Sequence, residues 1–172
     1  CLIMNQNKQM AELLFPNVTL TIKDLEERFP RRKEGTVVTR FAPSPTGFVH
    51  IGGLYASLVA ERIAHQSGGV FFLRIEDTDQ KRTVENGVQS IIDVLKDFDV
   101  NFDEGAIGEN GSDVGNYGPY TQTKRADIYR TFAKKLVEEG KAYPCFCSAE
   151  KLDMDRKRQE AVKMRTGYYG DF

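Results

Sequence analysis

Two short runs rich in valine, threonine and phenylalanine, with a helical segment between them, constrain the fold of this chain most. Residues 36–41 are bounded by glycine and proline, and residues 70–75 run from a Gly-Gly pair into an acidic turn, which is typical of buried strands. Between them, apolar residues recur at helical spacing from about Gly53 to Gln66, and a Gly-Gly pair ends the segment. A strand, a helix and a strand in this order predict two parallel strands joined by a right-handed crossover.

A second helix is predicted after the second strand, over about 83–98. In the first helix, the residues expected to face inward are Leu54, Leu58, Val59 and Ile63. In the second helix they are Val84, Val88, Ile91, Ile92, Leu95 and Phe98. The resulting βαβα order places the chain in the α/β class with a parallel sheet.

The chain changes character after Val100. Residues 105–118 are rich in Gly, Asn and Asp and predict a long surface loop. A helix is expected next, over about 124–139, with inward residues Tyr129, Phe132, Leu136 and Val137. The last predicted elements are a short strand over 142–146 and a charged helix from the N-cap Ser148 to about Arg165.

Three regions follow from this pattern. Residues 1–34 form an N-terminal extension, expected to pack on the surface with a short helix within 22–29. Residues 35–115 form the α/β core, and residues 116–172 begin a second subdomain.

Composition excludes several functional classes. The formal net charge is only -1, so a globally basic surface for nucleic acid is not indicated. No apolar run approaches the length of a membrane span, and the start lacks a signal pattern. The three cysteines do not indicate an extracellular disulfide framework. We therefore expect a cytoplasmic protein that does not associate with membranes.

The join between the first strand and the first helix is the candidate ligand site. In an open α/β sheet, ligands bind beyond the carboxyl ends of the strands, where helix N-termini offer free N–H groups. His50-Ile51-Gly52-Gly53 occupies this join. The glycines let a base or phosphate approach the backbone, and His50 can donate to phosphate oxygens. On these four residues alone, a tight packing turn with a structural histidine is an equally good interpretation.

Two longer strings change that balance. They are Arg-Phe-Ala-Pro-Ser-Pro-Thr-Gly-Phe-Val-His-Ile-Gly-Gly at 40–53 and Leu-Arg-Ile-Glu-Asp-Thr-Asp at 73–79. Both closely resemble the catalytic core of glutamyl-tRNA synthetases. Residues 50–53 resemble their form of the class I His-Ile-Gly-His signature, with Gly53 where the second histidine stands.

This resemblance is strongest over 36–103, continues through 117–125 and 142–147, and leaves residues 1–34 outside. It implies a Rossmann-like class I synthetase catalytic core with a parallel sheet. Residues 35–115 would be the first half of that core, and residues 116–172 the start of an inserted α+β subdomain that binds the tRNA acceptor stem.

The resemblance also implies a two-step ligase reaction. The carboxylate of L-glutamate attacks the α-phosphate of ATP, giving glutamyl-adenylate and pyrophosphate, and the acyl group then passes to the 3′ end of tRNA(Glu). Such a transfer requires alignment and positive charge rather than a protein nucleophile. The implied cofactors are ATP and Mg²⁺, the implied partners are L-glutamate and tRNA(Glu), and we expect a monomer.

Residue roles come from the same resemblance. Arg40 suits the side-chain carboxylate of glutamate, and Glu76 suits its α-ammonium group. His50 is the expected catalytic residue. The other expected site residues are Ala42 and Ser44 for glutamate, and Pro43, His50, Gly52 and Gly53 for ATP. Without the motif, a surface ion pair for Arg40 and a capping carboxylate for Glu76 would be the simpler interpretations.

Two further segments can each be interpreted in two ways. Asp77, Thr78, Asp79 and Arg82 would face the tRNA acceptor end in the family, or would form a solvated turn with Asp79 or Thr83 as a helix N-cap. The charged helix over 151–165 would meet acceptor-stem phosphates or would be a solvated face with compensating acids.

Cys145 and Cys147 suggest zinc, because some glutamyl-tRNA synthetases carry such a pair followed by a downstream Cys-x-His pair. A structural zinc site requires four ligands, and Phe172 stands where we would expect a cysteine. We therefore expect no zinc and no other protein-bound metal. The Lys-rich second signature of class I enzymes does not occur, so we expect an inactive fragment.

Three other assignments remain open at this point. Glutaminyl-tRNA synthetases usually have Pro-Glu-Pro where this chain has Pro43-Ser44-Pro45. A shorter relative that glutamylates queuosine in tRNA has a similar loop. A non-catalytic module that binds tRNA or protein is the alternative from a different functional class.

Overall fold

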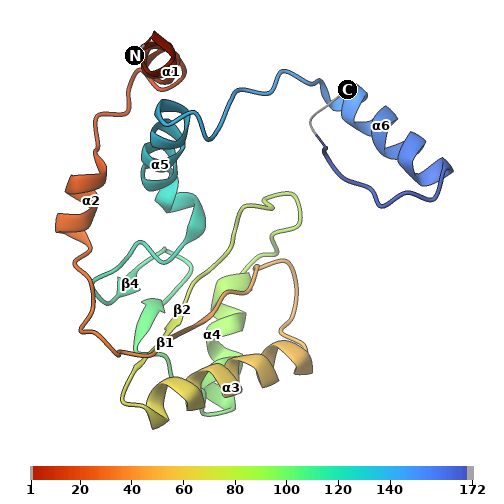
Figure 1. The fold of residues 1–172 in the computed structure, drawn as a ribbon. Helices are drawn as coiled ribbons and strands as arrows, with labels where there is room; N and C mark the ends of the chain where they lie inside the picture. Colours follow the sequence, from red (N-terminus) through yellow and green to blue (C-terminus); the bar gives the residue numbers. More distant parts are fainter. Residues whose placement is uncertain (1, 170–172) are drawn as a thin grey trace.

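The computed structural model describes residues 2–169 and centres on a four-stranded sheet (Figure 1). β1 pairs with β2, and β2 with β3, in parallel, whereas β4 is antiparallel to β3. The strands are β1 (Val38–Phe41), β2 (Val70–Leu73), β3 (Glu104–Ala106) and β4 (Asp113–Val114). The expected α/β fold with a mainly parallel sheet is confirmed.

Two helices connect the parallel strands and enclose the core with the sheet. α3 (Ile51–Gln66) links β1 to β2, and α4 (Gly87–Asp97) links β2 to β3. Phe71 and Leu73 lie on one face of β2 because side chains alternate along a strand, and both are fully buried. The buried core also contains Leu54, Ile75, Ile91, Leu95, Val100, Ala106 and Tyr120.

The prediction for the inward face of α3 is right for Leu54 and wrong for Val59 and Ile63, which are 39% and 51% exposed. The helix also carries Ile51 and Tyr55, so apolar residues recur every four positions on its outer side. Helical periodicity alone does not show which row of apolar side chains packs against the sheet. The polar or small residues that are buried instead are Ser57, Glu61 and Ala64.

α4 begins at Gly87, later than predicted, and this leaves Val84 exposed. The amide of Val84 donates to the carbonyl of Pro45 at 3.0 Å, which holds the preceding residues in turns against the loop after β1. Phe98 is the C-cap residue and is also exposed, contrary to the prediction. Ile91 and Leu95 are buried as expected.

The segment predicted as one long loop over 105–118 contains most of β3 and all of β4. Gly105 has φ +148, and a Cβ there would lie 2.5 Å from the carbonyl oxygen of Leu73. Glycine is therefore required for β3 to approach β2. The same residue type that indicated a loop in the sequence here permits strand pairing.

The next helix, α5 (Ala126–Glu138), follows a 3₁₀ turn and buries Val137 as predicted. The other three residues expected inward, Tyr129, Phe132 and Leu136, are 41–48% exposed. Ile128 and Thr131 are buried instead. Apolar side chains therefore surround much of α5, and their spacing did not identify its buried side. They are Ile128, Tyr129, Phe132, Leu136 and Val137.

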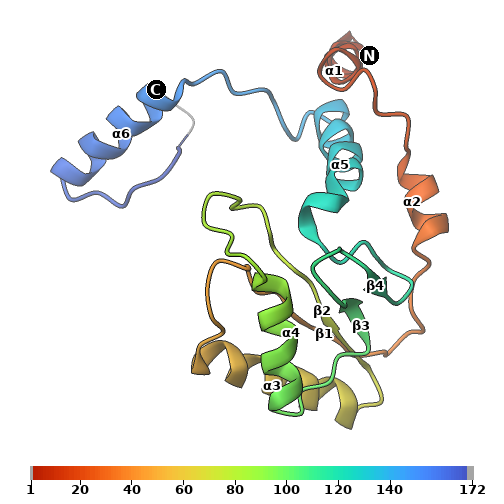
Figure 2. The same ribbon diagram turned by 180° about the vertical axis from the view of Figure 1, so that it is seen from behind.

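Residues 142–146 do not form the predicted strand, because no partner strand lies beside them among the described residues. They are part of an extended link to α6 (Ala149–Ala161), which stands apart from the sheet (Figures 1 and 2). Ser148 is confirmed as its N-cap and accepts a hydrogen bond from the amide of Lys151 at 3.2 Å. No helix within residues 2–169 is long and apolar enough to cross a membrane.

The N-terminal extension contains α1 (Leu2–Leu14), which was not predicted, and α2 (Ile22–Arg28), which was. Thr21 caps α2, because its hydroxyl accepts from the amide of Asp24 and the Asp24 carboxylate accepts from the amide of Thr21. α1 packs against α5.

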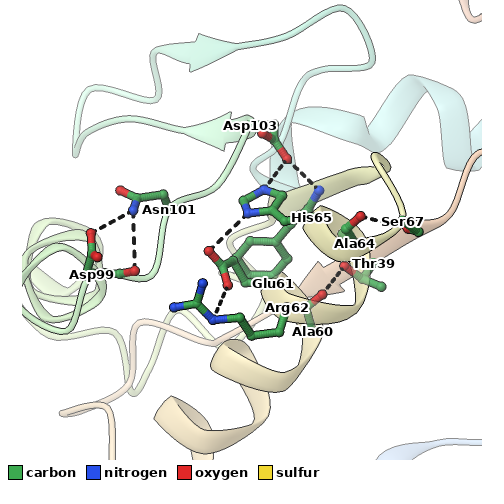
Figure 3. Close-up of polar contacts among 11 residues, drawn as sticks. Thr39, Ala60, Glu61, Arg62, Ala64, His65, Ser67, Asp99, Asn101 and Asp103 are labelled. Carbon is green, nitrogen blue, oxygen red and sulfur yellow. Dashed lines mark hydrogen bonds and ion pairs between the residues drawn. The ribbon is translucent and has the colours of Figure 1, made fainter.

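A charged cluster near the end of α3 holds that helix to the sheet (Figure 3). His65 lies between two carboxylates, with Nδ1 3.0 Å from Glu61 Oε1 and Nε2 3.0 Å from Asp103 Oδ2. Asp103 also accepts a hydrogen bond from the amide of Phe71 in β2. Arg62 Nε is 3.3 Å from the second oxygen of Glu61. The hydrogen bond to Asp103 raises the pKa of His65 above its ordinary value.

We expect His65 to titrate above 6.5, the pKa of an unperturbed histidine. Since its pKa is raised in the folded state, its stabilising contribution is complete below about 6.5 and is lost as the pH rises through the folded-state pKa. Both partners of the His65–Asp103 pair are partly exposed, so the loss should be at most about 1 kcal/mol. An NMR titration of the two histidines, assigned with His65→Gln, tests this. A midpoint at or below 6.5 would contradict it.

Candidate active site

The candidate active site is at the carboxyl ends of β1 and β2, where the two backbones continue side by side beyond the strands. The amide of Arg74 donates to the carbonyl of Phe41, and the amide of Glu76 donates to the carbonyl of Pro43, both at 2.9 Å. These bonds align the two strings that carry the sequence motif. Side chains more than thirty residues apart in the sequence therefore meet at one edge of the sheet.

Arg40 and Glu76, the residues expected to bind glutamate, face each other here. Nη1 of Arg40 lies 4.0 Å from Oε1 of Glu76, at the outer limit of an ion pair. Arg74 Nη2 lies 2.5 Å from the same oxygen and is the closer partner. Since Arg74 holds the carboxylate and Arg40 is 45% exposed, the guanidinium of Arg40 remains accessible to a ligand.

Sequence reasoning did not assign a role to Arg74. It lies two residues before Glu76, so in an extended backbone the two side chains share a face. That period-two spacing within the string over 73–79 was the available signal. Its side chain is only 20% exposed, and its position orients the Glu76 carboxylate toward Arg40.

His50 is the N-cap of α3, and this sets which ring nitrogen faces a ligand. Its Nδ1 accepts a hydrogen bond from the amide of Gly53 at 3.3 Å. In the neutral imidazole the proton must then be on Nε2, which leaves Nε2–H as a donor. The ring is exposed, so this donor is available at the positive end of the helix dipole.

The two glycines after His50 have different physical roles. A Cβ on Gly52 would lie 3.1 Å from the His50 ring, so glycine gives the ring room in its capping position. A Cβ on Gly53 would make only ordinary contacts, the nearest 3.5 Å from Val49 Cγ1. Gly52 is exposed at the helix start, where first-turn N–H groups are not used by the helix itself.

A hollow of about 360 Å³ brings four of the predicted site residues together on the loop between β1 and α3. Its lining includes Pro43, Ser44, His50 and Gly53, together with Phe41, Thr46, Gly47, Phe48 and Val49. Arg40, Ala42, Gly52 and Glu76 are not among its lining residues. Six of the eight predicted site residues therefore form two groups, four that line a hollow at the helix start and the Arg40–Glu76 pair, whereas Ala42 and Gly52 belong to neither.

The acidic turn after β2 connects this site to the rest of the chain. Asp77 accepts hydrogen bonds from the amide and the hydroxyl of Thr123, at 2.9 and 2.5 Å. Neither of the expected N-caps, Asp79 or Thr83, caps a helix, because α4 follows Asn86. Asp79 instead pairs with Arg82.

No three or more His, Cys, Asp or Glu side chains within residues 2–169 are grouped to hold a metal ion. Cys145 and Cys147 lie beside Tyr168, with Sγ to Oη distances of 3.2 and 3.9 Å. The Tyr168 hydrogen bond lowers the pKa of the Cys145 thiol. Phe172, on which the zinc argument depended, lies outside the described residues.

Comparisons with known proteins add independent findings. A family model described as tRNA synthetases class I (E and Q), catalytic domain, matches residues 36–171. The chain is 53% identical over 167 residues to the glutamate–tRNA ligase of Clostridium perfringens strain 13, covering 96% of this chain and 30% of that protein. It is 57% identical over 166 residues to that of Acetivibrio thermocellus, covering 95% and 30%.

Two solved structures are also similar. A glutamate tRNA ligase from Elizabethkingia meningosepticum in complex with its amino acid has a TM-score of 0.67 at 37% identity, covering 77% of this chain and 26% of that chain. Glutamate-tRNA synthetase from Elizabethkingia anophelis has a TM-score of 0.68 at 38% identity, with the same coverage. The chain spans about 30% of the length of the curated relatives it matches. The alignment with the Clostridium perfringens protein, at 96% of the chain, extends through most of residues 1–35, which the family model omits.

Proposed function

The chain belongs to the class I tRNA synthetases of the glutamate and glutamine (E and Q) type, and on this premise we propose that it forms the glutamate- and ATP-binding part of a glutamate–tRNA ligase. The observation that carries the proposal is the meeting of Arg40 and Glu76 beside the His50 helix start. Opposite charges 4.0 Å apart complement a small zwitterion that also carries a side-chain carboxylate.

Arg40 would select glutamate through its side-chain carboxylate. A planar guanidinium binds a carboxylate through two parallel hydrogen bonds, whereas the amide of glutamine has only one acceptor oxygen. Glu76, held by Arg74, would receive the α-ammonium group. Ala42 directly follows β1, and Ser44 lines the hollow at the helix start. Both would border the glutamate pocket.

ATP would bind at the start of α3. The accessible amide of Gly52 and the Nε2–H of His50 are donors at the positive end of a helix dipole, which favours phosphate. Pro43 and Gly53 line the adjoining hollow and would contact the nucleotide. When glutamate attacks the α-phosphate, negative charge grows on the phosphoryl oxygens, and these fixed donors would stabilise it. Mg²⁺ would be held mainly by the ATP phosphates, as is usual for this ion, and would neutralise their charge.

Residues 116–169 would lie toward the tRNA. The ion pairs of α6 do not favour a phosphate-binding face, because Lys151 pairs with Asp155, and Arg156 and Lys157 both pair with Asp153. Such pairs at helical spacing are typical of a solvated helix. We therefore propose tRNA contact for this region as a whole and not for these side chains.

Charging of an unmodified tRNA(Glu) transcript with labelled glutamate, by the enzyme that contains this chain, tests the proposal. We expect incorporation that depends on ATP and on the 3′-terminal adenosine of the transcript. A queuosine-modifying enzyme would not label this transcript, and a non-catalytic module would label no tRNA. Preferential incorporation of glutamine would instead identify the other amino acid of the family.

A further inference from the structure

The N-terminal extension crosses from α5 to the sheet before it enters β1. Figures 1 and 2 show α1 lying at the far end of α5, α2 beside the same helix, and residues 29–35 reaching the β3–β4 side of the sheet. Residues 2–35 are called the strap below. The strap makes specific contacts at both of its ends.

The lower end of the strap is anchored on β3 and the turn after β4. Nη2 of Arg32 is 2.6 Å from Oε2 of Glu104, and the Arg32 guanidinium lies 3.9 Å from the centre of the Tyr117 ring. The side chains of Arg32 and Glu104 are only 22% and 13% exposed. Solvent therefore screens this pair less than a surface salt bridge.

Tyr117 also contacts two other residues of the strap. Its hydroxyl donates to the carbonyl of Pro30 at 2.8 Å, and its ring stacks with Phe29 at a centroid distance of 6.4 Å. Phe29, Pro30 and Arg32 of the strap thus all contact the side chain of Tyr117.

The upper end of the strap is anchored on α5. Nζ of Lys134 lies 2.9 Å from Oε1 of Glu12 and donates to the carbonyl of Val18 at 3.1 Å. The Lys134 side chain is 14% exposed, and Ala11 on α1 is fully buried. Residues 14–20 line a cavity of about 550 Å³ together with residues of α5. The polar contacts that fix the strap are therefore made at Glu12 and Val18, which contact α5, and at residues 29–32 beside the sheet.

α5 needs such a second support because the sheet holds only its beginning. The preceding turn is fixed through Thr123 and Asp77, and Arg125 donates to the carbonyl of Pro119 at 2.7 Å. From there α5 leads away from the sheet, and its other end lies against α1 (Figure 1). A helix fixed at one end can pivot, whereas two points of support define its direction.

We propose that the strap fixes the direction of α5 relative to the catalytic sheet, and that Lys134 and Arg32 are positioning residues for the transfer of glutamate to tRNA. Residues 142–169 follow α5 in the chain, so the direction of α5 sets where this segment starts relative to His50. A substrate that must contact both regions, as the acceptor end of a tRNA would, then depends on the strap. Binding of glutamate and ATP, which would contact only the region of the sheet, does not depend on the strap. The tRNA part of this inference rests on the proposed function.

Reversal of one charge in the upper anchor tests the proposal. In the enzyme that contains this chain, Lys134→Glu places two carboxylates together, and Glu12→Lys in the same protein restores an opposite pair. Lys135→Glu is the matched control, because the neighbouring Lys135 pairs only locally, with Glu138 and Glu139 on or beside α5. Lys134→Gln is a milder variant should the reversal prevent folding.

We expect faster amide hydrogen exchange in α5 of Lys134→Glu, with exchange in α3 unchanged. The KM for tRNA should rise roughly tenfold, equivalent to about 1.4 kcal/mol, while the KM values for glutamate and ATP at saturating tRNA stay within about twofold. The double variant should recover most of both losses. Lys135→Glu should leave the KM for tRNA unchanged and speed exchange only in the last turn of α5, where it meets Glu138 and Glu139.

Unchanged hydrogen exchange in α5 of both Lys134→Glu and Lys134→Gln would show that the strap does not fix the direction of α5. Faster exchange with an unchanged KM for tRNA would overturn the positioning role. If the unaltered enzyme charges no tRNA, the proposed function fails, and the exchange measurement still decides whether the strap orients α5.

Discussion

Replacing Arg40 by alanine is expected to lower kcat/KM for glutamate activation by about 100-fold or more, equivalent to about 3 kcal/mol, without loss of folding. The side chain is 45% exposed, and its ion-pair distance to Glu76 is 4.0 Å, so it contributes little to stability. A bidentate pair between a guanidinium and a substrate carboxylate is among the strongest hydrogen-bonded contacts. Its loss should appear mainly in the KM for glutamate.

Two further variants test the planar geometry of Arg40 and the support of Glu76 by Arg74. Arg40→Lys keeps the positive charge but loses the planar fork, so we expect an intermediate activity. Arg74→Ala should also weaken glutamate binding, because it releases the Glu76 carboxylate that Arg74 holds at 2.5 Å. The measurement is glutamate-dependent pyrophosphate exchange with tRNA present, with the KM for ATP as the internal control. Unchanged exchange in Arg40→Ala would show that this residue does not bind the substrate.

The sequence was sufficient to predict the two parallel strands and the loop between β1 and α3. At these places several signals coincide: a short apolar run, prolines that exclude a helix, and glycines at a helix start. Hydrogen bonds such as Glu76 N to Pro43 O then follow from parallel pairing. Parallel pairing also brings Arg40 and Glu76 to the same edge of the sheet, whereas their roles in one glutamate pocket were implied only by the resemblance.

Other parts of the fold could not be predicted, because they depend on contacts that no local pattern records. Arg32 and Glu104 are 72 residues apart, and Lys134 and Val18 are 116 apart. The extension was expected to lie on the surface, and nothing within residues 1–34 indicates which charges are paired. Apolar residues on opposite sides of α3 and α5 likewise carried no information about which side is buried.

His50 has two roles in the structure that ordinary mutagenesis would confuse. Its Nδ1 caps α3 by accepting from the amide of Gly53, while its Nε2–H is the donor proposed to contact phosphate. An alanine substitution removes both roles. Loss of an N-cap typically costs about 1 kcal/mol of stability, whereas loss of a donor to the developing charge typically costs about 10²–10³ in kcat.

The comparison of His50→Ala with His50→Asn separates these roles. Asparagine is among the best N-cap residues, and its side-chain oxygen can accept from the amide of Gly53, but it places no donor where Nε2–H lies. We therefore expect both variants to lose about 10²–10³ in the rate of adenylate formation. Only the alanine variant should lose about 1 kcal/mol in the free energy of unfolding measured with urea. If His50→Asn instead forms adenylate at nearly the unaltered rate, His50 serves only as the cap of α3, and stabilisation of the transition state must come from other cations of the enzyme.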